Sequence, residues 1–418
     1  MLAERAGLLF ADAGSRAFAS LDLIAARDML SRAARLLPED SPRRLDLLPN
    51  LGVALTETGR PDETEALLVP AVERARSVGA EAAALRATIQ LLANRVYRSP
   101  TQPEIETAAT EAHAAEELLL PLGDDVGLAE AAIAIEYFGW MRGDLEEHRV
   151  WGLRAVRHGL AAGQPRAAAQ GVADAVLATA FGRIPFDRFP EIATEFEAIS
   201  DDPLTASASA ALRAMSALAE GDDDRFQELQ RAWRDGLDAH GLSWLAAAQG
   251  LVIAAVETWT GHAGAAEQRL LEAREVLSAA GDVWWLSTID GLLCSTLARE
   301  GRRRDFLTHA DAFDALDLVP DRDTLARRPL VRSQALLMRG STADAEDAAH
   351  AALAALDGCD LLITRAEAHL ALADALEARG RIDHAAIARA EAESVLKEKR
   401  FAAALGAFSE KASDGEPG

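Results

Sequence analysis

The chain has 418 residues, of which half are hydrophobic and only 5% aromatic, and it carries a formal net charge of −24 at pH 7. A negative field of this size repels phosphate backbones, so the composition argues against direct binding of nucleic acid. Cys294 and Cys359 lie too far apart for a disulfide framework or a metal-ligand spacing. We therefore expect a cytoplasmic protein without cofactor or metal.

The N-terminal segment has charged residues from Glu4 onwards and lacks the apolar core of a signal peptide. The longest weakly charged stretch, 241–256, contains Ser243 and Gln249. It falls short of the ~20 apolar residues that a membrane span requires. We expect no membrane partner.

Short turns, most of them built around glycine, punctuate the chain at nearly constant intervals. They lie near residues 20, 59, 103, 143, 182, 221, 261, 301, 340 and 380. An interleaved set of Gly, Pro and Asp connectors has a similar spacing, and a fixed period of this kind indicates a repeat array. The sequence predicts an all-α, right-handed superhelical solenoid of about ten antiparallel helical hairpins with a period of about 40 residues. The array is expected to span 1–409, with a short final helix at 398–409 and a disordered tail at 410–418.

The second hairpin shows the pattern most clearly. Apolar residues mark one side of a helix over 44–58, and Gly52 is small where the partner helix must approach. Gly59 ends this helix, and Pro61 stands where a first-turn proline is tolerated. Pro70 is expected to kink the second helix.

Residues 50–63 of this hairpin resemble the first helix and turn of a tetratricopeptide repeat. Leu51-Gly52, Leu55 and Gly59 stand at the spacing of that pattern, whereas Thr64 departs from the small residue expected after the turn. Later repeats restore a small residue there, at Ala266, Ala345 and Ala385. The period near 40 resembles the long repeats of bacterial regulators of the maltose-regulator type.

Residues 36–48 resemble the start of the repeat region that follows an ATPase module in actinobacterial cyclase-like and AAA-type regulators. Regulators of that kind carry a P-loop, and this sequence has no Gly-x-x-x-x-Gly-Lys-Ser/Thr. We expect the chain to be either a stand-alone repeat protein or the C-terminal part of a larger regulator.

Residue types that carry catalysis are scattered. The nine histidines form no His-x-x-x-His pair, and the acidic groups Asp201-Asp202 and 222–224 are interpreted as helix caps. The basic segment 302–304 is interpreted as a solvated turn, with an anchor for an acidic segment as the alternative. We expect no enzymatic activity, and a nucleophile–base pair that converges from distant repeats is the alternative.

One position on the first helix of each repeat, six residues before the turn, resembles the groove-lining positions of tetratricopeptide arrays. Its occupants are Val53, Tyr97, Tyr137, Val176, Met215, Ala255, Ser295, Gln334 and Asp374. The only two tyrosines of the chain stand there in adjacent repeats. The candidate ligand- or partner-binding residues are Asn94, Arg95, Tyr97, Glu130, Tyr137, Trp140 and Met141. Aromatic side chains suit a binding groove and an inter-repeat core equally well. Both alternatives stay open here, and also for a second cluster of Trp244, Trp259, Trp284 and Trp285.

These patterns predict a non-catalytic scaffold or sensor in a bacterial regulatory system. Its partner would be a peptide or protein segment, or an adjacent ATPase or regulator domain, bound in a concave groove. The alternative is a domain of a signalling ATPase or transcription regulator that senses a small-molecule effector, with Tyr97, Tyr137 and Trp140 stacking on it. An open groove favours the peptide, and a closed cavity favours the small molecule.

Overall fold

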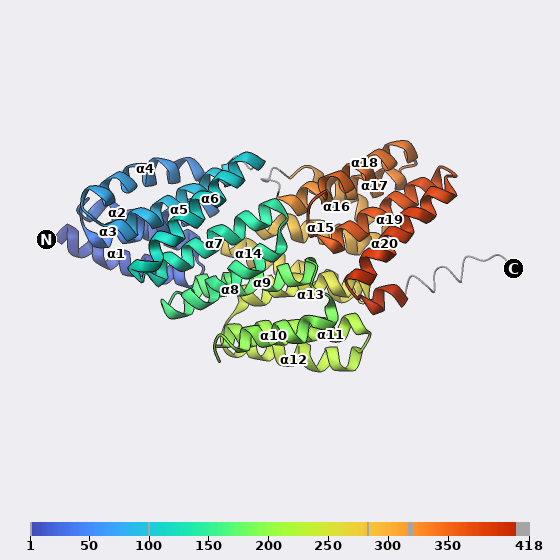
Figure 1. The fold of residues 1–418 in the computed structure, drawn as a ribbon, viewed down its shortest axis with the longest axis horizontal. Helices are drawn as coiled ribbons and strands as arrows, with labels where there is room; N and C mark the ends of the chain where they lie inside the picture. The colour runs from blue at the N-terminus through green and yellow to red at the C-terminus, as the bar shows by residue number, and fades with distance from the viewer. Residues whose placement is uncertain (1, 99–100, 282–283, 317–320, 407–418) are drawn as a thin grey trace. The chain divides into compact units, whose positions relative to one another are not determined.

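The computed structural model describes residues 2–98, 101–281, 284–316 and 321–406. Every regular element in these ranges is a helix, and consecutive helices pack as antiparallel hairpins (Figure 1). The predicted all-α helical-repeat fold is therefore confirmed. No helix within the described ranges is both long and apolar enough to cross a membrane.

The chain folds as two compact units. Unit 1 comprises Met1–Arg142, Glu147–Ala175 and Leu277–Trp284, and unit 2 comprises Gly143–Glu146, Val176–Val276 and Trp285–Gly418. The single array over 1–409 stays a prediction, and the tail at 410–418 lies outside the described residues. The first part of the chain forms α1 (Leu2–Ala19), α2 (Leu23–Leu36), α3 (Pro42–Glu57), α4 (Pro61–Ser77), α5 (Glu81–Arg98), α6 (Gln102–Leu119), η1 (Leu120–Leu122), α7 (Asp125–Arg142), α8 (Leu145–Ala161) and α9 (Pro165–Phe181).

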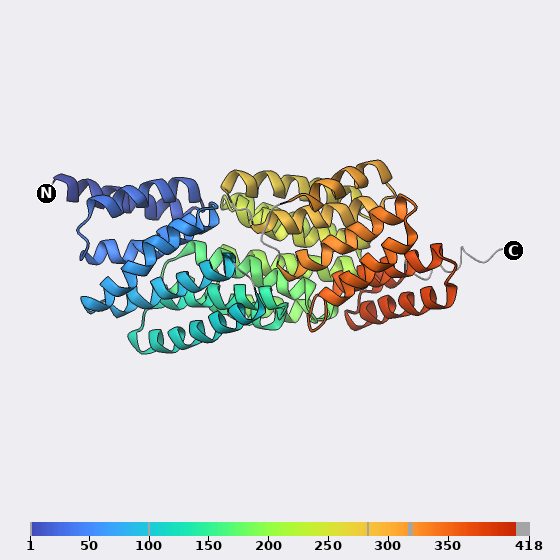
Figure 2. The same cartoon turned by 90° about the horizontal axis from the view of Figure 1, so that it is seen from above.

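The helices that follow are shown from a second direction in Figure 2. They are η2 (Phe186–Arg188), α10 (Phe189–Glu197), α11 (Pro203–Glu220), α12 (Asp223–Ala239), α13 (Ser243–Trp259), α14 (Ala263–Ala280), α15 (Trp284–Arg299), α16 (Arg303–Asp314), α17 (Arg322–Met338), α18 (Thr342–Ala355), α19 (Leu362–Ala378) and α20 (Ile382–Glu398).

Turn glycines and capping aspartates set the helix ends. Gly59 follows α3 and Gly221 follows α11 with φ of +77° and +84°, in the left-handed region that favours glycine. The Asp202 and Asp222 side chains accept hydrogen bonds from the backbone N–H groups of Leu204 and Arg225, at 2.9 and 3.1 Å. The interpretation of the acidic groups as helix caps is confirmed for these two residues.

The α3–α4 hairpin shows why a residue without a side chain is needed. A Cβ atom placed on Gly52 would lie 2.7 Å from Cδ1 of Leu68, which is fully buried on α4. The predicted close approach of the two helices is confirmed. The α4 helix continues through Pro70 to Ser77.

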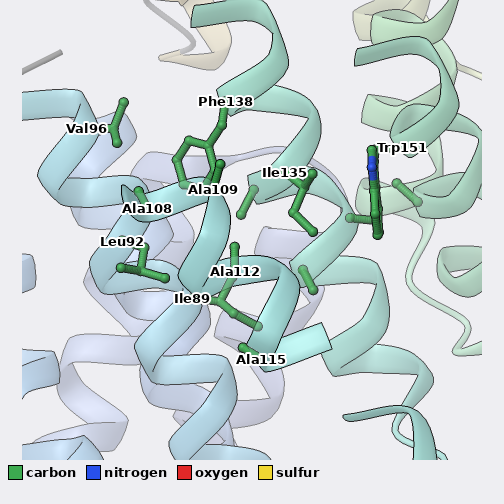
Figure 3. Close-up of a cluster of buried hydrophobic side chains, with 14 of the residues drawn as sticks. Ile89, Leu92, Val96, Ala108, Ala109, Ala112, Ala115, Ile135, Phe138 and Trp151 are labelled. Carbon is green, nitrogen blue, oxygen red and sulfur yellow. The ribbon is translucent and has the colours of Figure 1, made fainter. Parts of the chain in front are cut away.

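In one hydrophobic cluster of unit 1, the α6 helix packs between α5 and α7, and its buried side is rich in alanine. Figure 3 shows Ile89, Leu92 and Val96 of α5 and Ile135 and Phe138 of α7 around α6. The α6 helix contributes small side chains to this cluster, namely Ala108, Ala109, Ala112 and Ala115. Small residues let the helices approach closely, and the larger side chains of α5 and α7 fill the remaining space.

Two residues that follow α20 join the C-terminal part of unit 2 to the end of α9 and the segment after it. Nζ of the fully buried Lys399 donates to the backbone carbonyls of Thr179, Gly182 and Ile184 at 2.9, 2.7 and 2.6 Å. The fully buried Phe401 packs on the Phe186 ring, with centroids 4.6 Å apart. The final helix expected at 398–409 is described as a helix at 402–406, after α20 has ended, and 407–409 lie outside the described residues.

Candidate functional site

Three helices of unit 1 each carry a stripe of residues that is incompletely covered, except at the buried Arg86 of α5. The α5 helix packs against both α3 and α7, so the three stripes lie next to one another. We call the surface they form the stripe face. It consists of Asp46, Asn50, Val53 and Glu57 on α3, Arg86, Gln90, Ala93 and Tyr97 on α5, and Val126, Glu130, Ile133, Tyr137 and Trp140 on α7.

Residues 40 positions apart form rows across the stripe face. An amide row contains Asn50, Gln90 and Glu130, and an apolar row contains Val53, Ala93 and Ile133. The last row, Glu57, Tyr97 and Tyr137, is called the aromatic row. The apolar row packs on the hydrophobic clusters beneath it. The stripe face therefore has an apolar centre with polar and aromatic borders.

An ion pair joins α5 to α7 at one border of the stripe face. Nε and Nη2 of Arg86 donate to Oε2 and Oε1 of Glu130 at 3.0 and 2.7 Å. Burial disfavours the charged guanidinium, but the facing Glu130 carboxylate raises the pKa of Arg86 above its usual value. Asp124 and Asp46 act in the same direction. Both carboxylate oxygens of Glu130 are thus engaged by Arg86.

The aromatic row forms the other border. Burial, and after it the negative charge of Glu57, raises the pKa of Tyr97, so this phenol stays protonated at neutral pH. Tyr137 contacts the Phe138 ring at a centroid distance of 5.7 Å. Trp140 contacts the ring of the buried His148 at 5.6 Å. Tyr97, Tyr137 and Trp140 each keep part of their surface exposed.

The seven predicted binding residues do not all lie on one surface. Tyr97, Glu130, Tyr137 and Trp140 lie on the stripe face. Asn94 is 1% exposed: it donates to the Pro61 carbonyl at 3.0 Å and accepts from Thr56 at 2.8 Å, which ties α5 to the α3–α4 hairpin. Met141 is buried in the core cluster. Arg95 is exposed on α5 outside the stripe.

The expectation that one position lines a groove in every repeat is wrong for the middle of the chain. Val176, Met215, Ala255 and Ser295 are buried, whereas Val53, Tyr97 and Tyr137 remain partly exposed. Ser295 shows the reason, because its hydroxyl donates to Glu367, 72 residues further along, at 3.1 Å. In unit 2, side chains from later repeats fill the space that a groove would need.

The second aromatic cluster belongs to the core. Trp244, Trp259 and Trp285 of unit 2 are 7%, 4% and 9% exposed. The rings of Trp244 and Trp285 meet edge to face with centroids 6.3 Å apart. The side chain of Trp284 lies outside the described residues. The basic segment is a surface turn in which Arg302 pairs with Asp305, Glu267 and Glu300.

A buried group of titratable side chains lies beneath the aromatic row, between α7, α8 and α9. Glu136 and Asp174 are 1% and 9% exposed, and their carboxyl groups are close enough for each to shift the pKa of the other. Burial, and then the Asp174 charge, raises the pKa of Glu136 well above its usual value. Burial lowers the pKa of His148, whose Nδ1–H donates to the Glu136 backbone carbonyl at 2.8 Å. A neutral Glu136 beside an ionised Asp174 is the arrangement these contacts favour.

Metal binding has no visible basis in the described ranges, where no three His, Cys, Asp or Glu side chains converge on one point. Cys294 and Cys359 are buried thiols, and burial raises the pKa of Cys294 to about 12. Thiols of this kind are poor nucleophiles at neutral pH.

Sequence reasoning overlooked the amide row and the buried acids. The amide row could have been found from the 40-residue spacing of Asn50, Gln90 and Glu130. Glu136 and Asp174 had a weaker signal, since each is a single acid inside an otherwise apolar helical segment.

Comparison with known proteins adds no family assignment. No family model and no curated protein matches the chain. Among solved structures it is similar to the crystal structure of the apo form of RapI, with 13% sequence identity and a TM-score of 0.41. That similarity covers 94% of this chain and 99% of RapI.

Proposed function

We propose that this chain is a non-catalytic helical-repeat module of a bacterial regulatory system, and that it binds an extended segment of a partner protein on the stripe face. The observation that carries the proposal is the ordered set of rows on three adjacent helices. Each row offers one kind of contact, repeated from helix to helix, and a repeated contact suits a ligand that is itself a linear polymer.

The amide row supplies groups that recognise a peptide backbone. Asn50 and Gln90 are only partly buried, so their side-chain amides are within reach of a ligand. A primary amide both donates and accepts, so it can pair with the C=O and N–H of an extended chain. The apolar row beside it would cover the apolar side chains of the segment.

The two tyrosines of the aromatic row, together with Trp140, supply most of the apolar area. An aromatic side chain buries 150–250 Å², which corresponds to roughly 4–6 kcal/mol at 25 cal/mol/Å². Because Tyr97, Tyr137 and Trp140 are already largely buried, at most about a third of this remains for a ligand, before the costs of association. Three such contacts would support a reversible complex.

The small-molecule alternative would require an enclosed pocket. A hollow of about 400 Å³ lies on α14 in unit 2, and it is open and lined by residues of that helix alone, including Glu267, Leu271 and Glu275. This geometry does not favour capture of a metabolite. Binding of a small molecule is therefore one of the outcomes that the test distinguishes.

The test is selection of binders from a displayed library of random 12-residue peptides, followed by fluorescence polarisation with the selected peptides. Tyr137→Ala and Trp140→Ala should each weaken binding about tenfold, which corresponds to ~1.4 kcal/mol. Leu118→Ala is the matched control, because Leu118 is a 57% exposed apolar residue of the same unit on α6.

The proposal fails if both aromatic variants bind the selected peptides as tightly as the wild type while their circular dichroism and melting are unchanged. A parallel thermal-shift screen against a pool of metabolites separates the alternatives. Stabilisation by a metabolite that is lost in Tyr137→Ala, without any peptide binding, would establish the small-molecule function instead.

A further inference from the structure

One ion pair of unit 1 links residues 109 positions apart. Nη2 of Arg166, at the start of α9, lies 2.7 Å from both Oε1 and Oε2 of Glu57, at the end of α3. The Arg166 guanidinium also lies over the Phe18 ring of α1, with Cζ 4.6 Å from the centroid. The contact thus ties α9 to α1 and α3. We call it the latch.

The latch is less completely satisfied than the contact that closes unit 2. Nε of Arg166 is buried and has no hydrogen-bond partner within the described part of the chain, although the residue is only 7% exposed. In unit 2, each of the three N–H groups of Lys399 has a carbonyl acceptor. A buried donor without a partner costs about 1–3 kcal/mol. A competing ligand should therefore displace the latch at a lower cost in free energy than it would displace the Lys399 contacts of unit 2.

The latch also occupies the stripe face. Its carboxylate, Glu57, is the first member of the aromatic row, and the negative charge of Glu57 acts on Tyr97 in the same row. Arg166 therefore places a cationic side chain where a bound segment would contact the aromatic row. Carboxylates next to aromatic rings form a site that binds guanidinium and ammonium groups.

We infer that Arg166 stands in for a cationic side chain of the partner, and that the bound segment presents an arginine or lysine to Glu57 and displaces Arg166. The inference rests on the function proposed above. Three carboxylates and one guanidinium belong to the stripe face, and the whole chain carries a net charge of −24, so an approaching cation is attracted. A displaced Arg166 keeps a partner within electrostatic range, because Asp174 on the same helix already feels its charge.

The partner chemistry is tested with the random 12-residue library, selected on the wild type and on Glu57→Gln. Peptides selected on the wild type should share an arginine or lysine, and Glu57→Gln should lose this preference. Replacement of the shared cation by Gln should weaken binding to the wild type about tenfold and leave binding to Glu57→Gln unchanged. Arg166→Met should bind the cationic peptides about tenfold more tightly than the wild type, since no internal competitor remains.

Hydrogen exchange of the unliganded protein tests the latch by itself. Arg166→Met and Glu57→Gln should both accelerate amide exchange at the end of α3 and the start of α9, and the control Arg98→Gln should not. Arg98 forms a partly exposed ion pair with Asp62 in the same unit. Accelerated exchange without selection of any peptide would support the latch and overturn both the cationic partner and the proposed function. Peptides that bind without a cation preference would overturn the inference alone and leave the proposed function standing.

Discussion

Glu136 on α7 and Asp174 on α9 place two carboxyl groups side by side in the interior of unit 1, where burial raises the pKa of both. The packing around them is tight: Oε2 of Glu136 would lie 3.0 Å from a Cβ atom placed on Gly152 of α8. Asp174 faces the cationic Arg166 and the neutral His148, and Gln170 donates to it. A negative charge on Asp174 is therefore better compensated by neighbouring side chains than one on Glu136 would be, and Glu136 keeps the proton.

This relationship makes the stability of unit 1 depend on pH. The folded-state pKa of Glu136 is raised above its unfolded value, so the folded chain holds a proton that the unfolded chain releases. Stability from this group is complete below the unfolded pKa, near 4.5, and is lost as pH rises towards the folded pKa. Glu136→Gln keeps the shape and a donor to Asp174 but cannot ionise. We expect it to melt at a higher temperature than the wild type at pH 8, by the equivalent of about 1–2 kcal/mol.

The comparison at pH 4.5 is the internal control for this prediction. There Glu136 is protonated in the folded chain and about half protonated in the unfolded chain, so the advantage of Glu136→Gln should almost disappear. Glu130→Gln is the matched variant, because both Glu130 oxygens accept from the buried Arg86, so loss of this pair should destabilise unit 1 at pH 8. Equal melting of Glu136→Gln and wild type at both pH values would show that Glu136 is not held protonated.

A second prediction concerns the buried cation of unit 2. Arg327 is fully buried and donates to Asp323 at 2.6 Å, to Glu367 at 2.9 Å and to Thr364 at 2.9 Å. Arg327→Met leaves two buried carboxylates without their counter-ion, and removal of one partner from a buried pair costs about 3–5 kcal/mol. Urea unfolding followed by tryptophan fluorescence should show a loss of this size.

Arg332→Met is the control for Arg327→Met. Arg332 lies on the same helix and pairs with Asp314, and both side chains are about half exposed. An exposed pair contributes ~0–1 kcal/mol, so the midpoint should move little. If the two variants lose the same stability, the buried network does not hold α17 in place.

The fold could be predicted because its determinants are local. Turn glycines such as Gly59 and capping residues such as Asp202 act within a few residues of their own position, and they recur with each hairpin. The rows of the stripe face were predicted less well because positions were counted back from each turn. Counting assumes that a row stands at a constant distance from the end of each helix. Glu57 is instead the last residue of α3, Tyr97 the last but one of α5, and Tyr137 the sixth from the end of α7. The count therefore placed Val53, instead of Glu57, in the row of Tyr97 and Tyr137.

The remaining features depend on contacts that no local pattern encodes. The latch joins Glu57 to Arg166 over 109 residues, and Lys399 reaches Thr179 over 220. Both depend on how much each hairpin rotates relative to its neighbour, which is set by many small packing differences. For the same reason the burial of Ser295, which contacts a repeat two further along, could not be inferred from its position in its own helix.

A third prediction uses two helical glycines with opposite surroundings. Gly52→Ala would place its Cβ atom 2.7 Å from Leu68, whereas a Cβ atom on Gly236 of α12 meets nothing within 4 Å. Overpacking costs about 1–3 kcal/mol. Alanine in an open helical position gains about 0.5–1 kcal/mol over glycine. Gly52→Ala should therefore lower the melting temperature and Gly236→Ala should raise it. Leu68→Val should partly rescue Gly52→Ala. A stabilising Gly52→Ala would contradict the close approach of α3 and α4.

The last prediction concerns two lysines that stand two residues apart. Lys399 is fully buried and its ammonium group donates to three backbone carbonyls, whereas Lys397 is 63% exposed and pairs with Glu393 at 2.6 Å. Lys399→Met fills a similar volume but leaves the three carbonyls without a donor, and each unsatisfied buried group costs about 1–3 kcal/mol. We expect Lys399→Met to lower the urea midpoint of unit 2 strongly and Lys397→Met to leave it within error.

Limited proteolysis locates this effect. Without the Lys399 contacts the end of α20 should detach from the Thr179–Ile184 segment, and cleavage near residue 400 should precede cleavage elsewhere in unit 2. Unit 1 does not include these residues, so Lys399→Met should leave its hydrogen exchange unchanged. Because the latch of unit 1 is the separate Arg166–Glu57 ion pair, simultaneous loosening of both units in Lys399→Met would show that they unfold cooperatively.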